Sequence, residues 1–149
     1  MGGSVIVLSN AQRRVLQGIG PAMPADAYLA GGVAVGLRVG HRASRDLDIF
    51  TVVSDPSDLE DAMLAIDGAR ITSRARGTIY AEVAGIAVSI IRHRYPLLEP
   101  AERLADLGVL VASAADLTAM KLHAIVGRGA CRDFWDLHEL LRARAATLQ

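Results

Sequence analysis

The sequence has a single cysteine, no excess of either charge and no long apolar run. Cys131 alone cannot form a disulfide framework or a cysteine-ligated metal cluster, and it suits a reducing compartment. Sixteen basic residues balance sixteen acidic ones, so no overall field draws the molecule to nucleic acid or membrane. The longest early apolar run, Val5 to Leu8, is far shorter than the ~20 apolar residues of a bilayer span. We therefore expect a soluble cytoplasmic protein.

Lysine is almost absent as well. Of the sixteen basic residues all but one are arginine, and Lys121 is the exception. Where arginine serves nearly everywhere else, one retained lysine suggests a specific role. Chance is an equally good explanation from composition alone, and a surface position on an amphipathic helix is the ordinary alternative.

The residues that are present suit one globular domain. With 149 residues, 52% of them hydrophobic, the chain can build a hydrophobic core and is not expected to be disordered. We expect a single α+β domain over residues 5–149, with a small mixed central sheet, flanking helices and a C-terminal helical pair. Residues 1–4 are expected to be an expression remnant or a disordered start.

Capping residues, turns and hydrophobic periodicity predict the elements of the first half. They are a helix capped by Ser9 or Asn10 and ended by Gly20–Pro21, a strand at 28–30, a helix at 31–40, a strand at 46–53 and a helix capped by Ser57 or Asp58.

The second half is predicted in the same way. Its elements are a hairpin of strands 70–74 and 78–83, a strand at 86–91, a short strand at 109–112, a helix from Ser113 towards Val126 and a final helix over 132–145. Ser113 and Asp116 resemble a capping box. The final helix is expected to turn Phe134, Leu137, Leu140 and Leu141 inward.

Two carboxylates follow a pair of glycines at a distinctive spacing. Asp46 and Asp48 lie two residues apart in a predicted strand, so both side chains point to the same face, where they can ligate Mg²⁺. Gly31 and Gly32 open a predicted helix fourteen residues earlier, where backbone amides and the helix dipole can approach a phosphate. Each signal alone is weak, and solvated carboxylates are the ordinary alternative. Their order and spacing outline a nucleoside triphosphate site.

The residues Leu29–Gly32 and Gly40–Phe50 resemble the nucleotidyltransferase motif of the AbiEii toxin family, which belongs to the polymerase-beta-like nucleotidyltransferase superfamily. The segment from Lys121 to Leu137 is similar to the lysine and aspartate motifs near the end of such proteins. The resemblance spans roughly Leu8 to Leu141. It implies the polymerase-beta-like nucleotidyltransferase fold.

The resemblance also implies a role for individual residues. Gly31 and Gly32 would bind the phosphates, catalytic Asp46 and Asp48 would ligate Mg²⁺, catalytic Lys121 would lie near the triphosphate, and Asp133 or Asp136 would support catalysis and nucleotide binding. Asp133 and Asp136 share one helix face and could instead stabilise the start of that helix.

Each loop residue around these motifs has two possible roles, a functional one and an ordinary structural or solvated one. Arg42 and Ser44, between the glycines and the aspartates, are candidates for phosphate contacts, although an exposed loop arginine is ordinarily solvated. Arg128 and Arg132 carry the same ambiguity. His41 is favoured as a structural residue over a general base.

Two departures from the family pattern bear on activity. Val33 stands where such proteins commonly carry a hydroxyl residue. Polymerase-beta-like enzymes usually have a third acid on a neighbouring strand, and here Ser89 occupies that place. Serine is a poor Mg²⁺ ligand and no base at neutral pH. Glu82 is the only nearby replacement.

These observations favour an Mg²⁺-dependent nucleotidyltransferase that moves a nucleoside monophosphate from a nucleoside triphosphate to a hydroxyl. Family context suggests a toxin of a toxin–antitoxin or phage-defence system, with tRNA or a protein as acceptor and an antitoxin as partner. A degenerate relative that binds a nucleotide or a partner without turnover is the first alternative, and a purely structural module is the second. An RNA-binding stripe would require five arginines to share one face: Arg70, Arg74, Arg76, Arg92 and Arg94.

Overall fold

The computed structural model describes residues 5–104 and 106–147, so the expectation for residues 1–4 lies outside it. The elements are α1 Asn10–Ile19, the 3₁₀ turn η1 Gly20–Ala22, β1 Tyr28–Ala30, α2 Gly31–Val39, β2 Leu47–Thr51, the 3₁₀ turn η2 Pro56–Leu59, α3 Glu60–Leu64, β3 Ala69–Ala75, β4 Thr78–Val83, β5 Ile86–Arg92, β6 Glu102–Arg103, β7 Leu110–Val111, α4 Ala114–Gly127 and α5 Cys131–Thr147. The expected α+β class is confirmed.

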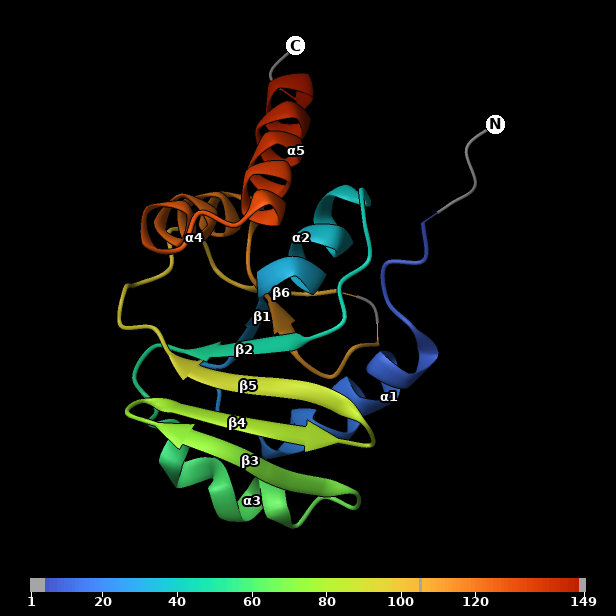
Figure 1. Cartoon of the computed structure of the whole chain (residues 1–149), viewed down its shortest axis with the longest axis vertical. Helices are drawn as coiled ribbons and strands as arrows, with labels where there is room; N and C mark the ends of the chain where they lie inside the picture. The colour runs from blue at the N-terminus through green and yellow to red at the C-terminus, as the bar shows by residue number, and fades with distance from the viewer. Residues whose placement is uncertain (1–4, 105, 148–149) are drawn as a thin grey trace.

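The described strands form one mixed sheet of seven strands in the order β3-β4-β5-β2-β1-β7-β6. β2 lies near its centre, parallel to β5 and antiparallel to β1. α1 packs against β5 and α3 against β3, whereas α2 packs on β1 and β2 and contacts α4 and α5. Figure 1 shows α2, α4 and α5 grouped at the β2 side of the visible sheet and α3 beyond β3.

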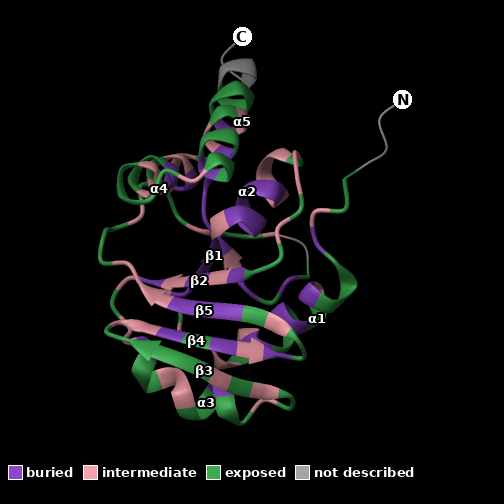
Figure 2. Ribbon diagram, in the orientation of Figure 1, coloured by how far each residue is buried: buried purple, intermediate pink, exposed green. Residues whose placement is uncertain are grey.

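Strand β2 alternates as its sequence predicts. Leu47, Ile49 and Thr51 are fully buried, while Asp48 and Phe50, on the opposite face, are half-buried. Figure 2 shows buried residues concentrated in β4, β5 and α2, with β3 exposed over most of its length. The core therefore covers one face of β2, and the other face is left for polar chemistry.

Helix α1 positions the loop that leads into β2. Ser9 caps α1, and its hydroxyl and the Gln12 side chain form a complete capping box. The Gln12 side-chain amide also donates to the carbonyl oxygens of Ser44, at 2.7 Å, and Arg45, at 3.1 Å. Gln12 therefore holds the backbone just before Asp46 in place.

The predicted cap of the helix after Pro56 is wrong by two or three positions. Asp55 is the cap, and its carboxylate accepts hydrogen bonds from the backbone N–H and the hydroxyl of Ser57. Pro56 then occupies the first helical position, where its missing N–H costs nothing.

The predicted inner face of α5 is only partly right. Leu140 is buried, and so are Asp133 and Asp136, but Phe134 and Leu141 are 53% and 49% exposed. The apolar pattern alone set the predicted inner face. Ion pairs with cations outside α5 turn both carboxylates inward, so Phe134 and Leu141 are left largely exposed.

The start of α4 is capped by Ser113, whose hydroxyl accepts the N–H of Asp116 at 3.0 Å. The other half of the predicted capping box is replaced by a tertiary contact. The Asp116 carboxylate accepts the backbone N–H groups of Leu98, at 2.7 Å, and Glu99, at 3.1 Å. Asp116 thereby fastens the segment after β5 to α4.

Candidate active site

The turn between β1 and α2 brings Gly31 against Asp48. Gly31 has φ +67°, a conformation that favours glycine, and Asp48 lies opposite Ala30 in the β1–β2 ladder. A Cβ added to Gly31 would lie only 2.2 Å from Oδ2 of Asp48. Glycine is therefore needed for the turn and for the close approach of the carboxylate.

Asp48 is a half-buried acid that has no salt bridge among the described residues. Burial raises its pKa, a hydrogen bond from Ser89 lowers it, and the charge of Asp46 raises it again. The Ser89 hydroxyl donates to Oδ1 at 2.7 Å. The charges of Lys121 and Arg128 also lower its pKa. A partly desolvated carboxylate whose hydrogen-bond partner is neutral is suited to receive a cation.

Ser89 lies where the sequence predicts it, directly beside Asp48 in the parallel β2–β5 ladder. Glu82 pairs in register with Ala87, not with Ser89, and forms a 3.2 Å ion pair with Arg70. In the described parts of the chain, no group of three or more His, Cys, Asp or Glu side chains is arranged to hold a metal. A metal here would depend on two carboxylates.

The two carboxylates line different hollows, and Asp46 precedes β2 instead of lying in it as the sequence predicts. Asp46, exposed just before β2, lines a hollow with Ser44, Arg45 and Glu82. Asp48 lines a different hollow. Their charges still interact, because Asp46 contributes to the raised pKa of Asp48.

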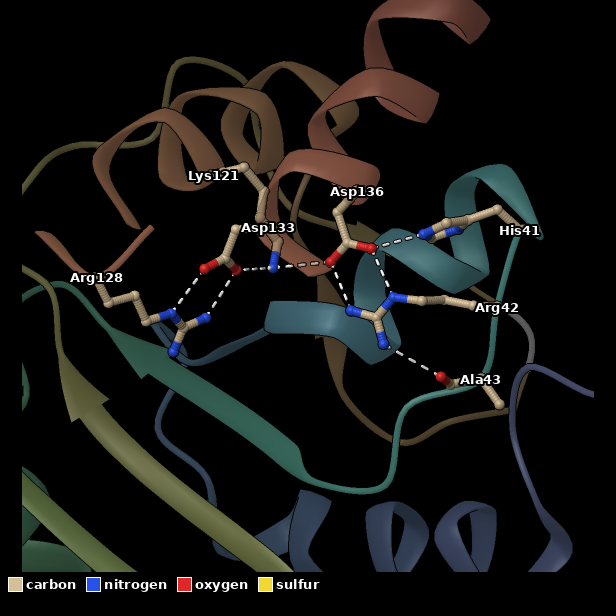
Figure 3. Close-up of polar contacts among 7 residues, drawn as sticks. All are labelled: His41, Arg42, Ala43, Lys121, Arg128, Asp133 and Asp136. Atoms are coloured by element: carbon tan, nitrogen blue, oxygen red, sulfur yellow. Dashed lines mark hydrogen bonds and ion pairs between the residues drawn. The ribbon is translucent and has the colours of Figure 1, made fainter. Parts of the chain in front are cut away.

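Lys121 is not the surface residue that its helix would ordinarily carry. It is 6% exposed, and its ammonium lies 2.9 Å from Oδ1 of Asp133 and 2.8 Å from Oδ2 of Asp136. Figure 3 shows it between the two carboxylates. Both acids are completely buried, so each depends on its cations.

Arg128 holds Asp133 from the other side. Its Nε and Nη2 donate to the two carboxylate oxygens at 2.8 Å each. The hydrogen bonds from Arg128, and then from Lys121, outweigh burial and hold the pKa of Asp133 well below its ordinary value. Arg128 comes directly after α4, in the turn that Gly129 completes with φ +60°.

Arg42 and His41 hold Asp136 in the same way. Arg42 forms a two-pronged pair with both Asp136 oxygens at 2.7 Å, and Nε2 of His41 lies 2.6 Å from Oδ1. Burial alone raises the pKa of Asp136, but hydrogen bonds from Arg42, Lys121 and His41 outweigh it and lower the pKa to about 2. The favoured structural role of His41 agrees with this contact.

We call these six residues the ion-pair cluster; they are His41, Arg42, Lys121, Arg128, Asp133 and Asp136 (Figure 3). It contains three permanent positive charges against two negative ones, before the histidine is counted. The surplus positive charge favours an anion beside it. The two aspartates lie behind the cations and position them.

Arg42 and Ser44 lie on the backbone of Gly32. A Cβ added to Gly32 would lie 2.7 Å from the Ser44 hydroxyl and 2.8 Å from Nη2 of Arg42. The structure thus brings together both glycines and both loop residues that the sequence singled out. Arg42 also forms two hydrogen bonds with Asp136, which fix the position from which it would make its predicted contact with phosphate.

One hollow of about 360 Å³, which we call the nucleotide hollow, is lined by some of these residues, whereas Gly32, Arg42, Ser44 and Asp46 are not part of its lining. Gly31, Asp48, Lys121 and Arg128 line its polar part. Apolar and aromatic side chains line the rest: Phe50, Ile91, His93, Leu117, Met120 and His123. Its volume lies within the range of small-molecule sites.

No local pattern in the sequence connects His93 with His123, which lie thirty residues apart. In the structure their rings are 6.3 Å apart on the wall of the nucleotide hollow. Only the three-dimensional fold reveals this.

The five arginines of the expected basic stripe do not share one face, because Arg70 and Arg74 point to opposite faces of β3. A β-bulge between Ile71 and Ser73 inverts the alternation of β3. Arg70 therefore pairs with Glu82 of β4, whereas Arg74 pairs with Glu60 of α3.

Solved structures with a similar fold define the class to which this one belongs. The chain is similar to the antibiotic-resistance factor ANT(2'')-Ia, with a TM-score of 0.65 and 15% identity over 95% of this chain and 96% of that one. It is also similar to JHP933 from Helicobacter pylori, with a TM-score of 0.57 and 18% identity over 91% and 68%. The Megavirus polyadenylate synthase has a TM-score of 0.56 and 12% identity over 99% and 37%. The fold is that of polymerase-beta-like nucleotidyltransferases.

Within this class, residues 68–149 match the family described as "Nucleotidyl transferase AbiEii toxin, Type IV TA system". The chain belongs to this family. "Uncharacterized protein aq_aa25" of Aquifex aeolicus (strain VF5) is 41% identical over 120 residues, which are 78% of this chain and 58% of that protein. The chain thus spans less than two thirds of that relative's length.

The family match contains Ser89 and the α4–α5 half of the ion-pair cluster, but not the segment from Gly31 to Asp48. The metal-ligand assignment therefore depends on the geometry of β2 and α2. None of the helices in the described ranges is long and apolar enough to cross a membrane.

Proposed function

We propose that the chain is a nucleotidyltransferase that transfers a nucleoside monophosphate from a nucleoside triphosphate to a hydroxyl, using Mg²⁺ bound by Asp46 and Asp48. One observation carries the proposal. Asp48, a half-buried acid without a salt bridge to any described residue, shares the nucleotide hollow with the cations Lys121 and Arg128. A cation-binding acid and a phosphate-binding pair of cations are thus adjacent.

The phosphates would lie between Gly31 and the two cations. Gly31 and Gly32 begin α2, where the backbone amides and the helix dipole favour an anion. The Lys121 ammonium is held by two carboxylates and is pre-positioned. Arg128 uses Nε and Nη2 on Asp133, which leaves Nη1 without a partner among the described residues. Fixed cations stabilise the charge that develops on the leaving pyrophosphate at little reorganisation cost.

The residues around Asp48 fit Mg²⁺. This ion is usually bound by one or two carboxylates and completes its shell with water and substrate phosphates. When bound, it would stabilise charge on the attacking and leaving oxygens. Two neighbours orient the Asp48 carboxylate. The Ser89 hydroxyl donates a hydrogen bond to Oδ1, and the Gly31 backbone lies close to Oδ2.

A degenerate relative that binds nucleotide without turnover is the second candidate. Ser89 favours it, because its hydroxyl donates to Asp48 and cannot take the proton of an attacking hydroxyl at neutral pH. In an active enzyme the acceptor would have to lose its proton to water or to another group.

The family description suggests the biological setting. We infer that the chain acts as a toxin in the cytoplasm, that its acceptor is a hydroxyl of tRNA or of a protein, and that an antitoxin protein is its partner.

The test uses α-³²P-labelled nucleoside triphosphates with Mg²⁺ and either total tRNA or protein extract as acceptor. Label in the acceptor, lost in Asp48→Asn and kept in the exposed-site control Asp61→Asn, would support the enzyme. Mg²⁺-dependent binding without transfer would support the degenerate relative. Absence of both would contradict the proposal.

A further inference from the structure

A second hollow of about 340 Å³ adjoins the nucleotide hollow, and we call it the aromatic hollow. Its walls come from three places in the chain: Tyr28 of β1, His93 and Tyr95 just after β5, and Met120 and His123 of α4. His93, Met120 and His123 line both hollows. The two hollows are therefore neighbouring parts of one surface, with the phosphate-binding groups at one end and aromatic rings at the other.

The wall that carries Tyr95 is held in place. Asp116 of α4 accepts the backbone N–H groups of Leu98 and Glu99, which anchors the segment after Tyr95. The backbone N–H of His93 donates to the Thr51 carbonyl at 2.8 Å. The aromatic hollow is thus formed by a fastened loop rather than by a chance gap.

Three rings surround the aromatic hollow without stacking on one another. The centroids of His93 and Tyr95 are 5.1 Å apart, those of Tyr95 and His123 6.2 Å, and those of His93 and His123 6.3 Å. The rings are inclined by 56°, 59° and 71° in these pairs. Tyr95 is 64% exposed and His123 is exposed as well, so both rings are accessible to another planar group.

The hydroxyl of Tyr28 is buried and has no hydrogen-bond partner in the described structure. Tyr28 and Asp116 line the same hollow. Burial, followed by the charge of Asp116, raises the pKa of Tyr28 to about 12, so the hydroxyl keeps its proton. A buried donor without a partner is costly, and an acceptor atom of a ligand would relieve that cost.

We propose that the aromatic hollow binds an unpaired nucleobase, which lies against the rings of Tyr95 and His123 and offers a ring nitrogen or carbonyl oxygen to the Tyr28 hydroxyl. Stacking on aromatic side chains is the usual way in which proteins hold unpaired bases. The inference rests on the proposed function, which puts phosphates in the adjoining hollow. The base belongs either to the nucleoside triphosphate or to a single-stranded RNA acceptor, and its recognition chemistry is the same.

The experiment compares ligands with and without a base. Calorimetry in Mg²⁺ measures the affinity of the full chain for each nucleoside triphosphate, for inorganic tripolyphosphate and for a mixed-sequence single-stranded octaribonucleotide. The variants are Tyr95→Ala and His123→Ala. Their matched controls are Tyr80→Ala and His138→Ala, which remove exposed rings of the same type outside both hollows.

If the bound base belongs to the triphosphate, we expect Tyr95→Ala and His123→Ala each to weaken triphosphate binding by roughly tenfold and to leave tripolyphosphate binding unchanged. If the base belongs to RNA, we expect the same roughly tenfold weakening for binding of the octaribonucleotide alone. Both results support the inference. If neither ligand binds the two variants more weakly than it binds the controls, the inference is overturned.

The arms also separate this inference from the proposed function. If neither triphosphate nor tripolyphosphate binds the unmodified chain, the proposed function fails. The octaribonucleotide arm still decides the inference in that case: a loss in Tyr95→Ala supports it, and absence of binding or of any loss overturns it.

Discussion

Replacing Gly31 by alanine tests whether the Asp48 carboxylate packs on the turn that begins α2. Gly40, at the other end of the same helix, provides the matched control. The two glycines have φ values of +67° and +68°. A Cβ on Gly31 would lie 2.2 Å from Asp48 Oδ2, whereas a Cβ on Gly40 would meet nothing within 4 Å. The two variants therefore share the backbone strain and differ in the carboxylate contact.

The magnitudes follow from these two terms. The left-handed backbone costs an alanine about 1 kcal/mol at either position. At Gly31 the carboxylate must also move away, which breaks its hydrogen bond with Ser89, and a hydrogen bond to a charged group contributes about 2 kcal/mol. We expect a loss of unfolding free energy of about 1 kcal/mol in Gly40→Ala and about 3 kcal/mol in Gly31→Ala.

Chemical denaturation measures both losses, and calorimetry measures Mg²⁺-dependent triphosphate binding. Gly31→Ala should weaken that binding more than tenfold, because the displaced Asp48 no longer faces the nucleotide hollow in its native position. Gly40→Ala should leave it unchanged. Equal stability losses and equal binding in the two variants would refute the assigned contact.

Three further variants test the burial of charged and polar groups. Lys121→Met should cost about 2–4 kcal/mol in denaturant unfolding, because two buried carboxylates then share one cation fewer; a loss below about 1 kcal/mol would mean that the ion pairs contribute little. Tyr28→Phe should leave the melting temperature unchanged or raise it, since it removes an unpartnered buried hydroxyl, and a clear fall would reveal a partner for that hydroxyl. Asp26 accepts hydrogen bonds from the backbone of residues 52–54 and from the Ser54 hydroxyl. Burial alone raises its pKa, but these bonds lower the pKa from 3.8 to about 2. Ionised Asp26 therefore stabilises the fold above pH 3.8, and this stabilisation disappears as the pH falls through about 2. Asp26→Asn should flatten that part of the acid-unfolding curve, and an unchanged curve would contradict the assignment.

The sequence predicted β2 and α2 from signals that lie within each segment. Alternation around Asp48 and the glycines at both ends of α2 are properties of short segments, so their geometry was readable before any tertiary contact was known. The position of Ser89 beside Asp48 followed from the same alternation, applied to the neighbouring strand.

Tertiary contacts explain what the sequence did not predict. The inward turn of Asp133 and Asp136 depends on cations from α4 and from the loops that follow α2 and α4, so the hydrophobic pattern of α5 misplaced Phe134 and Leu141. A single bulge in β3 separated Arg74 from Arg70. The aromatic hollow joins residues as far apart as Tyr28 and His123, which no local pattern connects.

We propose that Asp46 and Asp48 hold the cation that positions a nucleoside triphosphate. A calorimetric titration tests this with each nucleoside triphosphate, with and without Mg²⁺, for the unmodified chain and the double variant Asp46→Asn/Asp48→Asn. We expect binding that requires Mg²⁺ and disappears in the variant, while the variant still unfolds cooperatively. Binding that needs no Mg²⁺, or that survives the loss of both carboxylates, would contradict it.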